Sequence, residues 1–157
     1  MDISLVIVNY KAKDLTLNCI KSIKAADWPG LAYEIIVVDN YSADLASRDL
    51  VPLGRIKFFM NGRNLGFSAA NNQGIKVAQG KYIVVMNPDT VALKDVFAKL
   101  FDFMEHNPKV GLVGPKQFNL NNTVQDTCFR WPKFLTPFYR RTPLGRIGLA
   151  KKDLDRF

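Results

Sequence analysis

The chain has 157 residues, of which 48% are apolar and 23% are charged, a composition typical of one globular domain with a sizeable core. This composition excludes an intrinsically disordered chain, and no apolar run approaches the roughly 20 residues that a membrane-spanning helix needs. The net charge of +8 is unevenly spread, because residues 130–157 carry eight Lys and Arg against two Asp.

The basic C-terminal segment, residues 130–157, is open to three interpretations. It is a solvated chain end, it contacts an anionic membrane surface, or its aromatic residues pack on another part of the protein. Those aromatic residues are Trp131, Phe134, Phe138 and Tyr139. A basic segment can also contact nucleic acid, but aromatic residues among basic ones agree with a membrane surface, and nucleic acid is not expected.

The N-terminus and the cysteines bear on location. Met1-Asp-Ile-Ser4 lacks the basic region of a signal peptide, and Cys19 and Cys128 have no metal-ligand spacing. Cys19 lies on a predicted helix and is expected to be a small core residue. We therefore expect a cytoplasmic protein, peripheral at the inner face of the cell membrane if the basic segment contacts lipid.

Strands and helices are predicted to alternate along the first 115 residues. The apolar runs predict strands at residues 3–9, 33–40, 56–60, 82–86 and 111–115. Helical spacing predicts helices at residues 14–26, 42–50 and 67–79, and an amphipathic helix with apolar residues from 93 to 104. Residues 118–124, with a turn at Asn121-Asn122, predict a hairpin.

This alternation predicts an α/β fold with a mostly parallel, Rossmann-like sheet and helices on both faces. The 82–86 strand is expected to be buried and central, and it ends at Pro88 because proline has no N–H for a sheet hydrogen bond. Gly80 is expected to stop the preceding helix, in which Phe67 and Ala70 face the sheet. The predicted domain covers residues 1–130, and residues 131–157 form a tail or begin a further part.

Several common sites are absent from the sequence. No Gly-rich P-loop occurs, and the first strand is followed by Asn9-Tyr-Lys-Ala-Lys13 rather than a dinucleotide-binding fingerprint. The single histidine, His106, lies near a helix end and is expected at the surface or as a cap. No Ser, Cys or Thr stands in a nucleophile elbow.

Polar residues instead follow three predicted strands, at the sheet edge where α/β proteins bind ligands. They are Asn9 and Tyr10, Asp39 and Asn40, and Asn87 and Asp89, with an Asn- and Gly-rich loop at residues 61–74. Tyr10 could stack on a base, Asp39 could accept from a base or ribose, and Asp89 could hold Mg²⁺ or Mn²⁺ against a diphosphate. Alternatively, Asp39 serves a turn and Asp89 caps the next helix.

Four stretches together resemble family 2 glycosyltransferases, and most of all their rhamnosyltransferase-like branch. They are residues 6–10, 35–40, 64–75 and 86–90, within a likeness that covers about residues 3–130. The resemblance implies a GT-A fold, a nucleotide-diphosphate sugar donor such as a dTDP- or UDP-sugar, and a divalent cation, Mg²⁺ or Mn²⁺. It also implies inverting transfer to a glycan or lipid-linked acceptor.

The resemblance also implies roles for individual residues. Donor-binding positions are Asn9, Tyr10, Asp39, Asn64, Gly66, Asn71 and Asn87, with Tyr10 and Asp39 at the nucleoside and Asn64, Gly66 and Asn71 in a donor loop. Asn87-Pro-Asp89 occupies the place of the family's Asp-x-Asp signature, so Asp89 alone would hold the metal.

The family's catalytic base is an acidic residue in a downstream motif, and this chain has no matching pair after Asp89. The downstream acids include Asp102, Glu105, Asp126, Asp153 and Asp155, and none of these five is expected to be the base. The base is therefore predicted to be absent, so the chain is a fragment or a short homologue. The alternative is a non-enzymatic nucleotide-sugar-binding or partner module.

Overall fold

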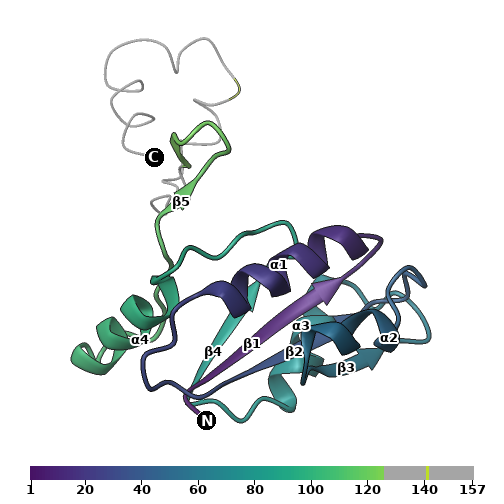
Figure 1. Ribbon diagram of the computed structural model, residues 1–157, viewed down its shortest axis with the longest axis horizontal. Coiled ribbons are helices and arrows are strands. Elements are labelled where there is room, and N and C mark those ends of the chain that lie inside the picture. The colour runs from purple at the N-terminus through teal and green to yellow at the C-terminus, as the bar shows by residue number, and fades with distance from the viewer. Residues whose placement is uncertain (126–140, 142–157) are drawn as a thin grey trace. The chain divides into compact units, whose positions relative to one another are not determined.

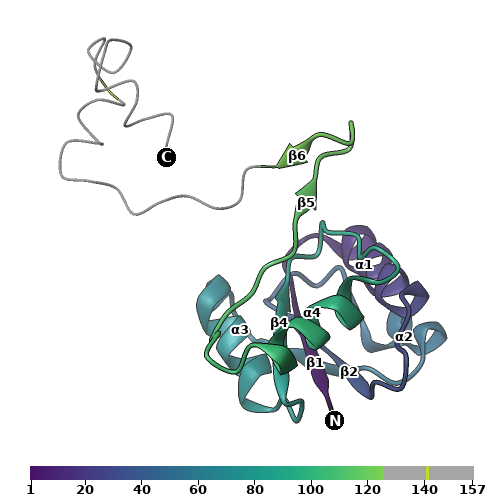
Figure 2. The same ribbon diagram turned by 90° about the vertical axis from the view of Figure 1, so that its left-hand side faces the viewer.

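The computed structural model describes residues 1–125 and 141 (Figures 1 and 2). The chain divides into two compact units, Met1–Val113 and Gly114–Phe157, which are described separately. The elements of the first unit are β1 (Ile3–Asn9), α1 (Lys13–Ala25), β2 (Tyr33–Asp39), α2 (Ser47–Leu50), the 3-10 helix η1 (Val51–Leu53), β3 (Lys57–Met60), α3 (Phe67–Lys76), β4 (Tyr82–Met86) and α4 (Val96–His106). The predicted boundary at residue 130 falls outside the described residues and stays a prediction.

The four strands of the first unit form one parallel sheet in the order β3-β2-β1-β4. Every residue of β1 is buried, because β2 and β4 flank it and helices cover both of its faces. The register sets Asn9 opposite Asp39, and Asp39 opposite Met60, so the polar strand ends lie at one edge. The predicted parallel sheet is thus confirmed.

Helices cover the two faces of the sheet, as Figure 2 shows with α1 and α3 on opposite sides. On one face, α1 and α4 pack on alternate strand residues such as Leu5 and Ile7, and Trp28 stacks on Phe97 with ring centroids 4.6 Å apart. On the other face, α3 packs through Ala70 on the remaining set of strand residues. These alternating sets are the two cores that a sheet covered on both sides requires.

Helix α3 approaches the sheet closely because it carries Gly74. A Cβ at this position would lie 2.5 Å from Cγ1 of Val6 in β1, a distance that side chains do not tolerate. The absence of a side chain at Gly74 therefore sets how near the helix, and the loop that precedes it, lie to the strands.

The 82–86 strand forms, but its predicted central place is wrong. Within the described residues β4 is an edge strand paired only with β1, and Ile83 and Val85 are 43% and 48% exposed. Val84 and Met86 point to the covered face and pack on its core. The apolar run is continuous because both faces of β4 are apolar, although only one is covered.

Other predictions differ from the structure in whether an element forms, where it ends and which side chains it buries. The 111–115 strand does not form, the 42–50 helix is shortened to α2, and the 67–79 helix ends at Lys76. Phe67, expected to face the sheet, is exposed, and Leu93 is exposed and lies before α4. Gly80 serves close backbone approach, since a Cβ there would lie 2.6 Å from the carbonyl carbon of Ile3.

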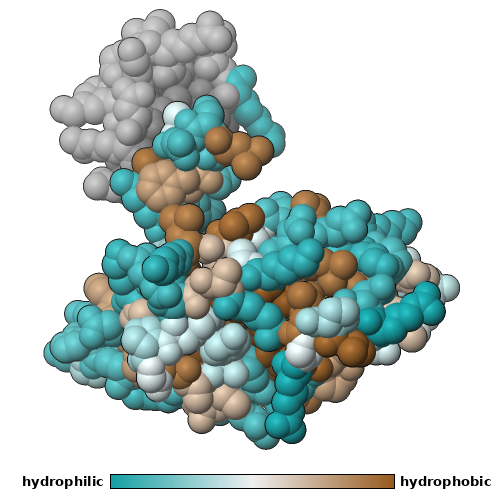
Figure 3. Space-filling model, viewed as in Figure 1, coloured by the Kyte–Doolittle hydropathy of each residue, from teal (hydrophilic) through white to brown (hydrophobic). Residues whose placement is uncertain are grey.

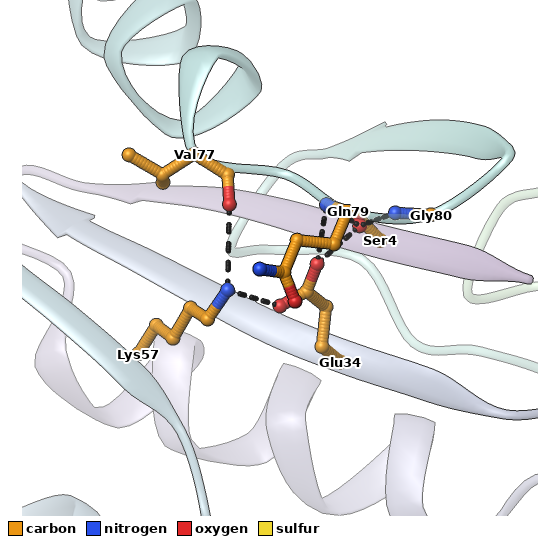
Figure 4. A network of polar contacts seen from close by, with 6 residues as sticks. All are labelled: Ser4, Glu34, Lys57, Val77, Gln79 and Gly80. Carbon is orange, nitrogen blue, oxygen red and sulfur yellow. Dashed lines mark hydrogen bonds and ion pairs between the residues drawn. The ribbon is translucent and has the colours of Figure 1, made fainter. Parts of the chain in front are cut away.

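A polar network joins three strands at the amino end of the sheet (Figure 4). Glu34 of β2 accepts hydrogen bonds from Ser4 Oγ of β1 at 2.6 Å and from the N–H of Gln79 at 2.7 Å, and Lys57 Nζ of β3 pairs with it at 2.7 Å. Ser4 Oγ in turn accepts the Gly80 N–H at 2.8 Å. The network fixes the connection between α3 and β4 against the sheet.

In the second unit, β5 (Gln117–Phe118) and β6 (Val124–Gln125) pair antiparallel and confirm the predicted hairpin. Asn122 in its turn has φ of 61°, a conformation that Asn tolerates. The basic C-terminal segment, Arg141 apart, lies outside the described residues. Within residues 1–125 and 141, no helix is both long and apolar enough to cross a membrane.

Candidate nucleotide-binding site

A pocket of about 290 Å³ opens at the carboxyl ends of β1, β2 and β4. Its lining residues come from these strand ends and from the start of α3, and they are Val8, Tyr10, Asn40, Asn64, Gly66, Phe67 and Pro88. Three of the residues that the sequence predicts at the donor therefore line the same pocket: Tyr10, Asn64 and Gly66. The lining is mostly apolar or aromatic and includes the side-chain amides of Asn40 and Asn64, which suits a flat ring with polar edges.

Asn9, which was predicted to bind the donor, does not line this pocket. Its side chain is fully buried, and its Nδ2 lies 2.6 Å from Asp39 Oδ1, 2.7 Å from Ser42 Oγ and 2.9 Å from Asp44 Oδ1. Thr16 Oγ1 donates to Asn9 Oδ1 at 2.8 Å. Asn9 thus ties β1 to the turn that follows β2 and, through Thr16, to helix α1.

Asp39 is also fully buried, and both of its carboxylate oxygens have partners. Oδ1 accepts from Asn9 and from the Ser42 hydroxyl, and Oδ2 accepts the Ser42 N–H at 3.1 Å. Tyr41 and Ala43 of the intervening turn have φ of 69° and 56°. Contact between Asp39 and a nucleoside stays a prediction, and it requires this turn to move.

The neighbouring Asp44 is half-buried and belongs to the same hydrogen-bonded network. Burial on its own would raise the pKa of Asp44, but hydrogen bonds from Ser42, from Asn9 and from the Lys13 N–H outweigh it and hold that pKa below its ordinary value. Asp44 is therefore ionised at neutral pH and supplies a negative charge to which the Asn9 amide is bound.

Helix α3 begins in the pocket wall. Gly66, directly before it, has φ of 83°, a left-handed conformation that favours glycine. Asn71 lies one turn inside the helix, is 6% exposed, and donates from Nδ2 to the Phe67 carbonyl at 3.0 Å. Its Oδ1 has no partner among the described residues, and Asn71 does not line the pocket. Its predicted role at the donor stays a prediction.

Asp89 is exposed in the turn after β4 and does not cap the following helix. Helix α4 begins seven residues later, at Val96, so the capping alternative fails. The turn is closed by Thr90, whose hydroxyl and N–H both donate to the Asn87 carbonyl, at 2.5 and 3.2 Å. The Asp89 carboxylate is left without a hydrogen bond or ion pair among the described residues.

These groups fit a divalent cation that is shared with a ligand rather than one enclosed by protein. The described residues hold no group of three or more His, Cys, Asp or Glu placed to bind a metal. Mg²⁺ is commonly held by one or two carboxylates together with phosphate oxygens, and the free, exposed Asp89 carboxylate can supply one such ligand.

The acids downstream of Asp89 in the described part of the chain are engaged elsewhere. On or next to α4, Asp95 pairs with Lys99, Asp102 with His106, and Glu105 with Lys81. Glu105 also accepts a hydrogen bond from the Tyr82 hydroxyl. Tyr82 lies at the amino end of β4, whereas the pocket lies at the carboxyl ends of the strands. Asp126, Asp153 and Asp155 lie outside the described residues.

His106 and Cys19 behave as predicted. His106 is exposed near the end of α4, and its Nδ1 lies 2.8 Å from the Asp102 carbonyl. Cys19 is buried in the core, where burial raises the pKa of its thiol to about 11 and keeps it protonated. Cys128 lies outside the described residues.

Three lining residues, Val8, Phe67 and Pro88, were not predicted as site residues, and Asn40 was predicted only as a polar residue at a strand end, without a role at the donor. Asn40 and Pro88 lie next to residues that were predicted at the site. Their position just after a strand was the sequence signal that could have placed them in the pocket. Phe67 was assigned to the core because its spacing from Ala70 fits a helix face. That spacing does not show that the first turn of the helix projects past the sheet edge.

The sequence matches the family Glycosyl transferase family 2 over residues 4–149. Among curated relatives, an uncharacterized glycosyltransferase of Methanocaldococcus jannaschii is 36% identical over 83 residues, which cover 50% of this chain and 29% of the relative. The poly(ribitol-phosphate) beta-glucosyltransferase of Bacillus spizizenii is 31% identical over 113 residues, which cover 68% and 18%. The chain thus spans less than a third of the length of these relatives.

Solved structures share the fold at lower identity. S. aureus TarS, in complex with UDP-GlcNAc, has a TM-score of 0.62 and 20% identity over 69% of this chain and 32% of its own. The mannosyltransferase PcManGT of Pyrobaculum calidifontis, in complex with GDP-Man and Mn²⁺, has a TM-score of 0.59 and 19% identity over 65% and 32%. The fold is GT-A, and the chain belongs to glycosyl transferase family 2.

Proposed function

We propose that this chain is the donor-binding part of a glycosyltransferase that moves a sugar from a nucleotide-diphosphate sugar to a glycan or lipid-linked acceptor, with inversion. The supporting observation is the pocket at the carboxyl ends of β1, β2 and β4, where Tyr10, Asn64 and Gly66 meet. The exposed Asp89 carboxylate lies in the same post-β4 turn as the lining residue Pro88.

In this proposal the base of the nucleotide lies against Tyr10 and Phe67, and the diphosphate extends toward Asp89. A bound Mg²⁺ or Mn²⁺ would neutralise the departing diphosphate, and Asp89 would hold that ion. The proton of the acceptor hydroxyl must be taken by a base, and no acid downstream of Asp89 in the described residues lines the pocket. The base is proposed to come from outside this chain.

The donor is proposed to be a dTDP- or UDP-sugar, with rhamnose as the sugar suggested by the sequence resemblance. The structural neighbours hold UDP-GlcNAc and GDP-Man, so a binding panel must include guanosine nucleotides. Among curated relatives, one is named for succinoglycan biosynthesis and one for teichuronic acid biosynthesis. Extracellular polysaccharides are therefore the proposed class of product.

Calorimetry of the 157-residue chain with UDP, dTDP and GDP, each with and without Mn²⁺, tests the binding proposal. We expect one diphosphate to bind more tightly with Mn²⁺, and Asp89→Ala to remove most of that Mn²⁺ effect. Asp102→Ala, which removes an exposed carboxylate of α4, is the matched control and should bind as the wild type does. If no nucleotide binds, or if Asp89→Ala changes nothing, the proposal fails.

The second candidate is a non-enzymatic nucleotide-sugar-binding module. It is favoured by the engagement of Asp95, Asp102 and Glu105 in ion pairs away from the pocket. A fusion of this chain to the acceptor-binding part of a close relative separates the two candidates. Sugar transfer by the fusion supports a donor-binding part, whereas donor binding without transfer supports the module.

The basic C-terminal segment is proposed to contact anionic lipid at the inner face of the cell membrane. Eight Lys and Arg with aromatic neighbours would give an electrostatic attraction that weakens as salt rises. Co-sedimentation with phosphatidylglycerol vesicles should show binding at low salt that falls steeply toward 0.5 M NaCl. Deletion of residues 130–157 should abolish this binding, and binding that survives the deletion would contradict the proposal.

A further inference from the structure

Two backbone N–H groups fix the orientation of two side-chain amides beside the pocket. The Leu65 N–H donates to Asn40 Oδ1 at 3.0 Å, and the Gly66 N–H donates to Asn64 Oδ1 at 2.8 Å. A backbone N–H can only donate, so the side-chain atom that receives it must be an oxygen. The positions of the oxygen and the nitrogen in both amides follow from this.

The same assignment satisfies the contact between the two side chains. Asn40 Nδ2 donates to Asn64 Oδ1 at 2.7 Å, and Asn61 Nδ2 donates to Asn40 Oδ1 at 3.2 Å. Asn40 is 2% exposed, so its amide cannot exchange these partners for water. Turning the Asn40 amide over would set its nitrogen against the Leu65 N–H, which places donor against donor in a buried site.

Asn64 consequently keeps one free polar group. Its Oδ1 receives two donors, from Asn40 and Gly66, whereas its Nδ2 makes no hydrogen bond among residues 1–125 and 141. Asn64 is exposed and lines the pocket. The group that it can offer to a ligand is therefore a hydrogen-bond donor.

We propose that Asn40 is a positioning residue that holds the Asn64 amide with Nδ2 available in the pocket, where it donates to an oxygen of the bound nucleoside. This inference rests on the proposed nucleotide-binding function. The nucleoside is favoured over the diphosphate because the other walls of the pocket, among them Val8, Phe67 and Pro88, are apolar. Such walls suit a base, while phosphate oxygens favour charged partners.

The positioning step can be tested without any ligand. Asn40→Asp replaces the nitrogen that faces Asn64 Oδ1 by an oxygen. At pH 7 the Asn64 amide should then give up its bond from the Gly66 N–H, turn and donate to the new carboxylate, because hydrogen bonds to charged groups are the stronger ones. In ¹⁵N NMR spectra the side-chain NH₂ of Asn64 should shift and exchange more slowly with water than in the wild type. An unchanged Asn64 NH₂ signal in this variant would overturn the positioning role.

A double-mutant cycle tests the role in binding. Uridine, thymidine and guanosine, and their diphosphates, are titrated into the wild type, Asn64→Ala, Asn40→Asp and the double variant. Asn64→Ala should weaken the nucleoside and its diphosphate by the same factor, roughly 3- to 10-fold, which is the effect of one hydrogen bond. As a single substitution, Asn40→Asp should weaken nucleotide binding. In the Asn64→Ala background it should cause no further loss of affinity.

Asn107→Asp is the matched control, because Asn107 is an amide that caps the far end of α4. A loss confined to the diphosphates would assign the donor to phosphate and overturn the nucleoside assignment. Further weakening by Asn40→Asp in the Asn64→Ala background would show a general structural role instead. If the wild type binds no nucleotide, the proposed function fails together with the nucleoside assignment, while the NMR result still decides the positioning role.

Discussion

Asn9 shows how a single residue at a strand end organises the site. Of the first six residues of β1, all but Ser4 have apolar side chains that pack in the two cores. The seventh residue, Asn9, carries a side-chain amide instead. Its buried NH₂ lies between the carboxylates of Asp39 and Asp44, which would otherwise repel each other. A buried polar group is tolerated when its bonds are satisfied, and here they also join the ends of β1 and β2 to α1 and to the turn after β2.

Replacing Asn9 should therefore cost more than an ordinary surface substitution. Asn9→Ala leaves Asp39, Asp44 and Thr16 each without one partner, so we expect the free energy of unfolding to fall by about 2–3 kcal/mol. Urea unfolding followed by circular dichroism measures this loss. Asn18→Ala, at an exposed position of α1, is the control and should change stability by less than about 0.5 kcal/mol. Equal losses in both variants would show that the Asn9 bonds contribute little.

At the scale of the elements, strands β1 and β2 were the most predictable part of the chain. Each contains an apolar run of four residues, 5–8 in β1 and 35–38 in β2, that ends in a polar residue, a pattern typical of strands buried on both faces of a parallel sheet. The helix that follows β1 was placed within one residue at each end. Here local sequence and tertiary environment favour the same structure, and prediction succeeds.

The errors lie where tertiary context decides. Ile83 and Val85 are as apolar as Val84 and Met86, so nothing local distinguishes an edge strand with one bare face from a central strand. Gly80 fits a helix stop by spacing, but its actual constraint is the close passage of β1, which sequence does not reveal.

The site shows the same division between motif and geometry. Tyr10, Asn64 and Gly66 line the pocket, whereas Asn9 and Asp39 are fully buried and do not line it. A motif gives the strand end at which a residue lies. Whether its side chain enters the cavity or binds its neighbours depends on the turn that follows, and the positive φ angles at Tyr41 and Ala43 were not predictable.

At the scale of the first unit, the two ends of the sheet carry different kinds of polar structure. The carboxyl end holds the pocket and the free carboxylate of Asp89. The amino end holds the closed network around Glu34, in which the carboxylate meets Lys57, Ser4 and the Gln79 N–H (Figure 4). The surface seen in Figure 3 mixes polar regions with apolar patches. The closed network stabilises the fold, and the opposite end is the one at which we propose that the nucleotide binds.

The Glu34 network makes the stability of this unit depend on pH. Burial on its own would raise the pKa of Glu34, but hydrogen bonds from Lys57, Ser4 and the Gln79 N–H outweigh it and hold that pKa below its ordinary value of 4.5. Because the pKa is lower in the folded chain, the ionised carboxylate stabilises the fold above pH 4.5. This contribution is lost as the pH falls from 4.5 through the lower pKa of the folded state.

Glu34→Gln should lower the free energy of unfolding by about 1–3 kcal/mol at pH 7, because the amide cannot pair with Lys57 and sets an NH₂ against donors. The difference from the wild type should shrink as the pH falls below 4.5, since protonation then removes the same charge from the wild type. Urea unfolding at pH 7, 5, 4 and 3 measures this convergence. Asp102→Asn, an exposed control on α4, should show a small difference at each pH, because exposed ion pairs contribute little. If the difference in free energy of unfolding between Glu34→Gln and the wild type stays the same down to pH 3, the loss comes from packing around the side chain. The charge of Glu34 would then not contribute to stability.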